Sequence, residues 1–207
     1  EKAEDIHEEC RAIVRDVMRD HRRVIFNGNN YSEEWRREAR QRGLPELAST
    51  VDAAGELITQ KSVELFEKHG VFNRKELESR YEIRLESYCK TVQIEASTMV
   101  EMALRQIIPA VTAYSRFLAE TLCRLKDTGL TLDVTLEAGL LKEVSAASAA
   151  LRLALGKLEK LLDKGAAMED GYEKARFFQE RLLPAMEALR GPADRLETLL
   201  GKEYWPM

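Results

Sequence analysis

Residues 74–127 read RKELESRYEIRLESYCKTVQIEASTMVEMALRQIIPAVTAYSRFLAETLCRLKD, a stretch that contains no glycine and a single proline, Pro109. Apolar and aromatic residues recur along it at steps of three and four: Leu77, Tyr81, Leu85, Tyr88, Val92, Ala96, Met99, Ala103 and Ile107. This spacing places them on one face of an α-helix. At 1.5 Å per residue, one continuous helix would be about 80 Å long.

Local signals mark the start and the middle of this helix. Asn73 followed three residues later by Glu76 resembles a capping box, in which each side chain bonds the other residue's backbone N–H. Pro109 removes one helix hydrogen bond, so a bend is expected near the middle. Ion pairs at a spacing of four residues are predicted on the outer face: Glu76–Arg80, Glu86–Lys90 and Glu101–Arg105.

Two more long helices are predicted after Gly129. The first carries a heptad pattern and ends at Gly165; its positions are Val144, Ser148, Leu151, Leu155, Leu158 and Leu162. The last alternates strictly between steps of three and four: Tyr172, Ala175, Gln179, Leu182, Met186, Leu189, Ala193, Leu196 and Leu200. Because this phase continues through Gly191–Pro192, a kink is expected there rather than an end. Short connections make these helices run antiparallel.

The N-terminal part is predicted to begin with a helix from about Ala3 to His21. Val24–Phe26 is the only strand candidate in the chain, and the turn sequence Asn27–Asn30 follows it. A lone strand leaves its backbone groups unpaired. It must therefore pair with polypeptide outside this sequence or relax into a loop.

Two further helices are expected before the long one. Ser32 is a suitable N-cap for a short helix that stops at Gly43. A second helix is predicted from Val51 to about His69, and Gly70 would form its C-terminal cap.

The sequence therefore predicts an all-α protein: an antiparallel bundle of long helices built on one long Pro-kinked central helix, with at most one short strand near residues 24–26. Two regions are expected. Residues 1–45 would form a junction segment made of a helix, a short strand or turn and a short helix, and residues 46–207 a C-terminal helical bundle domain.

Composition excludes several classes of protein. The chain has 207 residues, 44% hydrophobic and 33% charged, with a formal net charge of −4. A mildly acidic chain has no global field to attract nucleic acid. No apolar run approaches the roughly 20 residues needed to span a bilayer. The expected partners therefore include neither nucleic acid nor membrane, and a cytoplasmic location fits best.

The three cysteines do not suggest a site. Cys10, Cys89 and Cys123 are widely spaced, and no CxxC pair occurs. An odd number of separated cysteines fits a reducing compartment. Each is interpreted as a small buried hydrophobic residue rather than as a nucleophile.

No complete catalytic motif is found. The sequence lacks HExxH, GxxxxGK, GxSxG and GxGxxG. Glu4 and His7 form only half of a carboxylate-bridged metal site, and His7 with Cys10 lacks a third ligand. His7 is interpreted as a surface residue. No catalytic, cofactor-binding or metal-ligating residue is assigned to this chain.

Two N-terminal features could indicate a binding site for an anion or for RNA. Backbone N–H groups of Asn27–Asn30 could bind an anion, with Arg22 and Arg23 nearby, although a plain turn explains the sequence better. The region is locally basic through Arg19, Arg22, Arg23, Arg36, Arg37, Arg40 and Arg42. Glu33, Glu34 and Glu38 are interleaved with these arginines, which favours a solvated or subunit-facing surface.

Four residues of the long helices could belong to a site but have simpler explanations. Glu95 lies near the apolar stripe and is expected at its edge, because a buried unpaired carboxylate is rare. Tyr81, Tyr88 and Tyr114 are interpreted as core aromatics whose hydroxyl groups reach a polar rim, not as a cofactor site.

Several phrases of the sequence resemble type III glutamine synthetases. HRRVIFNGNNYSEEW at residues 21–35 is similar to the segment after the catalytic barrel in that family, and RGLP at 42–45 continues the similarity. LESRYEI at 77–83 and YCKTVQIEA at 88–96 resemble the family's long C-terminal helix, and EYWP at 203–206 its near-terminal motif. Asn30 departs from the glycine expected in the turn.

The resemblance implies a non-catalytic C-terminal helical domain of a longer ATP-dependent ligase that joins ammonia to glutamate in glutamine biosynthesis. In that family ATP and Mg²⁺ or Mn²⁺ are bound upstream, so no cofactor is expected in this chain. The implied partners are the missing N-terminal catalytic part of the same polypeptide and further copies in a stacked double ring. The chain alone is expected to be inactive.

An independent helical scaffold that binds a partner helix is the alternative. It predicts a complete polar surface, whereas the first hypothesis predicts exposed apolar residues on the first helix and around Val24–Phe26. The sequence leaves open the oligomeric state, any regulatory role, and which helix faces the catalytic domain or a neighbouring subunit.

Overall fold

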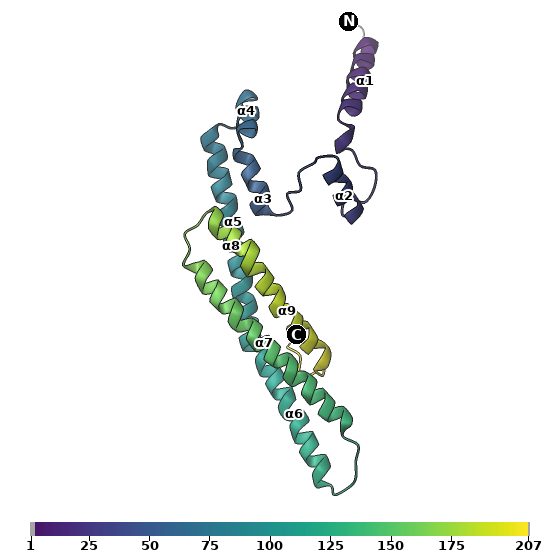
Figure 1. The fold of residues 1–207 in the computed structure, drawn as a ribbon, viewed down its shortest axis with the longest axis vertical. Helices are drawn as coiled ribbons and strands as arrows, with labels where there is room; N and C mark the ends of the chain where they lie inside the picture. Colours follow the sequence, from purple (N-terminus) through teal and green to yellow (C-terminus); the bar gives the residue numbers. More distant parts are fainter. Residues whose placement is uncertain (1–2, 207) are drawn as a thin grey trace. The chain divides into compact units, whose positions relative to one another are not determined.

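The computed structural model describes residues 3–206, and side chains from residue 6 onward. The described residues form helices and connecting turns without a β-strand, as predicted for an all-α protein (Figure 1). The chain divides into two compact units, Glu1–Ser49 and Thr50–Met207.

The first unit contains two helices, α1 (Ala3–Asp20) and α2 (Glu33–Gln41). Between them, the predicted strand at Val24–Phe26 does not form. Val24 ends a short 3₁₀ helix, Arg22–Val24, and Ile25 and Phe26 continue as irregular chain. A single strand leaves its backbone N–H and C=O groups unpaired, and no second strand lies among the described residues to pair with them.

A packed cluster around Trp35 holds this irregular segment against α2. The rings of Phe26 and Trp35 stack with their centroids 4.5 Å apart, and the Arg42 guanidinium lies 5.5 Å from the Trp35 ring centroid. Arg42 also donates to the carbonyl oxygens of Ile25 at 2.8 Å and Arg23 at 3.0 Å. The helix starts as predicted, because Ser32 Oγ accepts a hydrogen bond from the Trp35 N–H.

The second unit begins with α3 (Thr50–Ala54), a 3₁₀ helix Gly55–Ile58 and α4 (Gln60–Lys68). The single helix predicted from Val51 to His69 is therefore wrong. Gly55 is a poor helix former, and Thr59 starts a new helix by accepting a hydrogen bond from the Ser62 N–H. Gly70 caps α4 at φ 61°, as expected.

The long helix begins at the predicted capping box. Asn73 Oδ1 accepts from the Glu76 N–H at 3.0 Å, and the Glu76 carboxylate accepts from the Asn73 N–H at 2.8 Å. The predicted pair of Glu76 with Arg80 is replaced, because the cap uses this carboxylate and Arg80 lies over the Phe72 ring, 4.2 Å from its centroid. The pairs Glu86–Lys90 and Glu101–Arg105 form as predicted.

Asn73→Ala is expected to lower the free energy of unfolding by about 1 kcal/mol, because it leaves the Glu76 N–H without its acceptor. Urea denaturation followed by circular dichroism measures the change. Asn73→Ser should retain most of the stability, and Lys75→Ala, on the exposed side of the same turn, is the matched control. Equal stability of the Asn73→Ala and Lys75→Ala variants would contradict a stabilising cap.

The long helix is continuous but not uniform. It consists of α5 (Arg74–Met102), a π-helical turn at Ala103–Ile107 and α6 (Ile108–Asp127). In the π turn the Ile108 N–H donates to the Ala103 carbonyl, five residues back instead of four. The wider turn makes room for the ring of Pro109, which cannot donate a hydrogen bond. The interruption thus lies just before the proline predicted to cause it.

The last helix shows the same arrangement. It consists of α8 (Tyr172–Phe177), a π turn at Phe178–Leu182 and α9 (Leu183–Leu199). The interruption precedes Pro184, whereas Pro192, where a kink was predicted, lies inside α9 without a break in the assigned helix. Gly191 before it carries no side chain that would crowd the proline ring.

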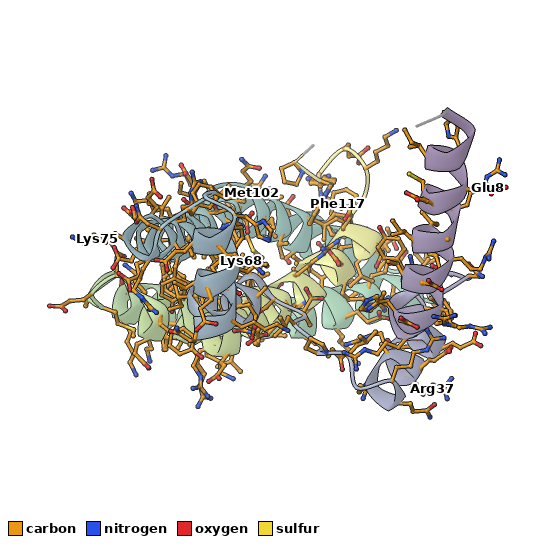
Figure 2. All side chains as sticks on the ribbon, turned by 90° about the horizontal axis from the view of Figure 1, so that it is seen from above. Glu8, Arg37, Lys68, Lys75, Met102 and Phe117 are labelled. Atoms are coloured by element: carbon orange, nitrogen blue, oxygen red, sulfur yellow. The ribbon has the colours of Figure 1, made fainter. Side chains whose placement is uncertain are left out.

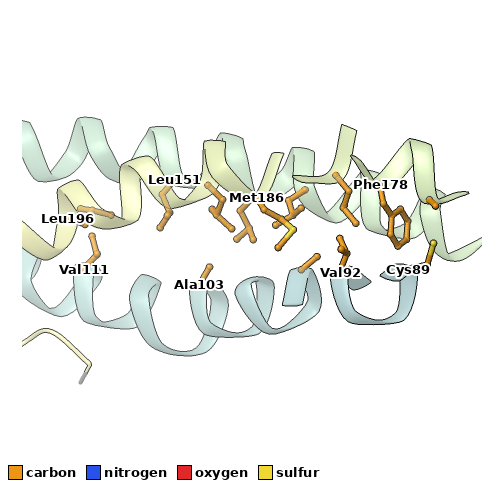
Figure 3. Packing of buried hydrophobic residues seen from close by; sticks show 14 of the residues in the cluster. Cys89, Val92, Ala103, Val111, Leu151, Phe178, Met186 and Leu196 are labelled. Atoms are coloured by element: carbon orange, nitrogen blue, oxygen red, sulfur yellow. The ribbon is translucent and has the colours of Figure 1, made fainter. Parts of the chain in front are cut away.

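The bundle is formed by the long helix, α7 (Thr135–Ala166) and α8–α9 (Figure 1). Helix α9 packs along α7, α7 packs on α5 and α6, and α3 with the 3₁₀ helix covers the first part of α5. Figure 3 shows the core between them. Its fully buried large side chains include Leu85, Leu151, Leu155, Leu158, Phe178, Leu182 and Leu196.

Candidate functional site

The clearest unpartnered surface is the apolar face of α1. Large side chains along this helix are 51–62% exposed: Ile6, Ile13, Val14, Val17 and Met18. Together with Cys10, they recur at three- and four-residue steps and so lie on one face. Figure 2 shows the side chains along the helix, with Glu8 labelled. We call this surface the α1 stripe.

The rest of the first unit offers no core that would hide such residues. None of the described side chains in residues 6–49 is fully buried, and those of Ile25, Phe26 and Trp35 are half-buried. Tyr31 is 97% exposed and Val24 58%. The exposed apolar surface predicted on the first helix is therefore found. Of the surface predicted around Val24–Phe26, only Val24 is exposed, while Ile25 and Phe26 are half-buried.

The Asn27–Asn30 turn is closed on itself. The Tyr31 N–H donates to Asn29 Oδ1 and the Ser32 N–H to the Asn29 carbonyl, both at 3.0 Å. These bonds use the N–H groups of Tyr31 and Ser32, not those of Asn27–Asn30, so the anion interpretation of the turn stays a prediction. Gly28 does not have a positive φ. A Cβ there would lie 2.7 Å from the Phe26 ring, so the turn needs glycine for space.

The arginine-rich region is largely neutralised by its own acids. Arg36 bonds Glu33 at 2.9 Å and Glu46 at 2.6 Å, and these carboxylates raise the pKa of Arg36 above its ordinary value. Arg40 pairs with Glu46, and Arg42 with Glu38. These pairs agree with the solvated or subunit-facing surface predicted from the interleaved charges.

The predicted half-sites for metal do not assemble. His7 and Cys10 lie one turn apart on α1, and both are exposed. Glu4 falls among residues whose side chains lie outside the described part. Across the described residues, no group of three or more His, Cys, Asp or Glu side chains is placed to hold a metal ion.

Of the three cysteines, Cys89 alone is buried as predicted. Burial raises the pKa of the Cys89 thiol, the opposite of what an activated nucleophile requires. The expectation of burial is wrong for Cys10 and Cys123, which are exposed. Cys10 lies on the apolar side of α1, and this side of the helix is exposed. The position of Cys10 in the helical repeat therefore could not predict whether its side chain is buried.

The other residues singled out on the long helices have structural roles. Glu95 is exposed at the edge of the buried stripe, as expected. Tyr114 packs on Tyr204 with ring centroids 5.1 Å apart, which joins α6 to the C-terminal turn. The Tyr88 hydroxyl does not reach a polar rim: it is buried without a hydrogen-bond partner among the described residues, and desolvation raises the pKa of Tyr88.

Sequence reasoning missed one buried charge, Lys174. It is 7% exposed, and its Nζ donates to Asp170 at 2.9 Å while lying 5.9 Å from the Phe178 ring centroid. The signal was available, since Asp170 precedes Lys174 by four residues at the start of α8. The pair lies at this helix start, where Asp170 and Lys174 share a surface hollow with Lys90 and Gln93.

None of the helices in the described residues is both long and apolar enough to cross a lipid bilayer.

Comparison with known proteins shows to which family this sequence belongs. A family model described as "Glutamine synthetase C-terminal domain" matches residues 9–126, more than half of the chain. The match includes the α1 stripe from Ile13 onward, the Trp35 cluster and nearly all of the long helix.

Curated relatives match over almost the whole chain. A glutamine synthetase of Butyrivibrio fibrisolvens is 35% identical over 201 residues, which are 97% of this chain and 29% of that protein. A glutamine synthetase of Bacteroides fragilis (strain YCH46) is 30% identical over 89% of this chain and 26% of its own length. A Type-3 glutamine synthetase of Dictyostelium discoideum is 29% identical over 94% and 27%.

The chain thus spans little more than a quarter of the length of the curated relatives it matches. Its predicted resemblance is confirmed by the family model and by these relatives. The chain belongs to the glutamine synthetase C-terminal domain family.

Proposed function

We propose that this chain is the non-catalytic C-terminal helical domain of a type III glutamine synthetase, and that it serves packing against the catalytic part and assembly of the oligomer. The whole enzyme would join ammonia to glutamate with ATP and Mg²⁺ or Mn²⁺ in the cytoplasm. The resemblance implies that the metal and nucleotide ligands would lie in the preceding polypeptide.

The observation that carries this proposal is the α1 stripe. Fully burying one large aliphatic side chain contributes about 1.5–3 kcal/mol. Covering the five half-exposed side chains of this face would therefore stabilise an interface considerably. A monomeric protein seldom leaves such a face in water. The chain spans only 29% of the Butyrivibrio fibrisolvens relative, and further polypeptide of this kind would cover the stripe.

Residues 1–45 would accordingly act as the junction with the catalytic part, and residues 46–207 as the bundle domain. Val24, which is 58% exposed, would belong to the surface of this junction that docks on the catalytic part. The family's stacked double ring would bring further copies into contact with this chain.

The alternative, an independent scaffold that binds a partner helix, predicts a complete polar surface. The exposed α1 stripe and the 97% exposed Tyr31 favour the first proposal over it.

The decisive experiment introduces Ile13→Lys into the full-length enzyme. A lysine in the covered stripe would place an unpaired charge in an apolar interface. The specific activity, measured as glutamine formed from glutamate, ammonia and ATP, should fall at least about tenfold, with smaller oligomers seen by light scattering. Ala12→Lys adds the same charge on the neighbouring, polar side of α1 and should change neither.

The isolated chain should form no glutamine under the same conditions. Glutamine formation by the chain alone would refute a non-catalytic role. Equal activity and assembly of the Ile13→Lys and Ala12→Lys enzymes would refute docking through the α1 stripe.

A further inference from the structure

A pocket of about 240 Å³ lies in the bundle beside the first π turn. The π turn, α9 and the C-terminal turn form its walls. Its apolar lining consists of Met99, Met102, Ala103, Ile107, Leu151, Leu189, Ala193, Trp205 and Pro206. The volume is below the roughly 300–1,000 Å³ typical of pockets for drug-sized ligands, so it suits the apolar part of a smaller molecule.

The local backbone explains why the pocket exists. The π turn widens the helix before Pro109, and the residue it directs at the core, Ala103, has only a methyl group. Figure 3 shows Ala103 directed toward the layer that carries Leu151 and Met186. The C-terminal turn brings Trp205 to the opposite wall, where Tyr204 anchors it by packing on Tyr114.

The rim of the pocket is charged, and acids dominate it. Arg190 and Asp194 on α9 pair with each other at 3.4 Å. Glu197, the next rim residue of α9, makes no ion pair among the described residues. The rim thus carries one guanidinium group and two carboxylates. The charge left over at the mouth is the negative charge of Glu197.

We propose that this pocket binds a small apolar molecule that carries one ammonium group. The apolar part fills the space between Met99, Leu189 and Trp205, and the ammonium group pairs with Glu197 at the mouth. Trp205, which lines the same pocket, would add a cation–π attraction. The pocket belongs wholly to the helical bundle, so the inference does not depend on the proposed docking of α1.

The probe is 2-phenylethylammonium, compared with neutral 2-phenylethanol and anionic 3-phenylpropanoate. Binding is measured by calorimetry on the unmodified chain and by Trp205 fluorescence in a Trp35→Phe chain, which removes the only other indole. The ammonium should bind about tenfold more tightly than the alcohol, through the combined ion pair and cation–π attraction, and the anion most weakly.

Two variants test the assigned roles. Glu197→Gln should abolish the preference for the ammonium while the alcohol still binds, and Ala193→Phe should fill the pocket and abolish binding of both. Glu187→Gln is the matched control, because Glu187 is exposed on the same helix but does not line the pocket. Circular dichroism checks that each variant remains folded.

Three results would overturn the proposal. The first is the absence of saturable binding of 2-phenylethylammonium at millimolar concentration. The second is equal or tighter binding of the alcohol or the anion. The third is an unchanged ammonium preference in the Glu197→Gln chain.

Discussion

Leu155→Ala should lower the free energy of unfolding by about 2–5 kcal/mol, the usual cost of removing a fully buried leucine side chain. Leu155 lies in the middle of α7 and is 0% exposed. It faces the region where α7 packs against α9 and the long helix. Close neighbours from several helices cannot collapse together into the space of three lost carbon atoms, so a cavity remains.

Leu153→Ala provides the control for this prediction. Leu153 lies two residues earlier in the same helix but is 64% exposed, so its truncation should change the stability by no more than about 0.5 kcal/mol. Both values come from urea denaturation with a common slope. Similar losses for the two variants would mean that α7 does not face the core as described.

Gly165→Ala should destabilise the chain by about 1–3 kcal/mol, although alanine is the better helix former. Gly165 is buried near the end of α7, directly against Phe178. A Cβ at this position would overlap Phe178 Cε1 and lie 3.1 Å from Cζ. Because the Phe178 ring is itself 0% exposed, it has no free space into which it can move.

The opposite sign is expected at Gly156, nine residues earlier on α7. A Cβ there meets nothing within 4 Å. Gly156→Ala should therefore stabilise the chain by about 0.5–1 kcal/mol through helix propensity alone. Thermal unfolding of both variants checks the prediction. A stabilising Gly165→Ala would show that the contact with Phe178 is not tight.

The double variant Gly165→Ala with Phe178→Leu separates the clash from other effects. If the overlap with the ring is the cause, the alanine should cost less in the leucine background than in the original chain, by at least about 0.5 kcal/mol.

The periodicity of the sequence predicted the long helix because helical phase is a local property. Leu77, Leu85, Val92 and Ala96 are buried as the stripe required. The capping box at Asn73 and Glu76 was predictable for the same reason, since its partners are three residues apart. The break at Gly55–Thr59 was not, because a single glycine inside a helical pattern is often tolerated.

The π turns limited what helical phase could predict. Gln179 was assigned to the buried stripe, but Phe178 occupies the core and Gln179 is half-buried. A π turn adds one residue to a helical turn, so the phase shifts by one position within Phe178–Leu182. A signal exists in the sequence: both π turns end two residues before a proline, Pro109 and Pro184.

The α1 stripe and the pocket also differ in how far the sequence could predict them. The exposed face of α1 could be predicted because one helix carries all of its residues. The pocket could not, because residues from the π turn, α7, α9 and the C-terminal turn must be brought together before it exists. Gly165 was predicted to end a helix, but only the folded bundle shows that it makes room for a ring from another helix.

The continuity of α5, the π turn and α6 has a consequence for cooperativity. The short helices α3 and α4 pack on the first part of this rod, while α7 packs on both of its parts. Fraying at one end removes hydrogen bonds from the backbone that supports the other. The bundle should consequently melt in a single step, and amide hydrogens at its two ends should exchange with similar free energies.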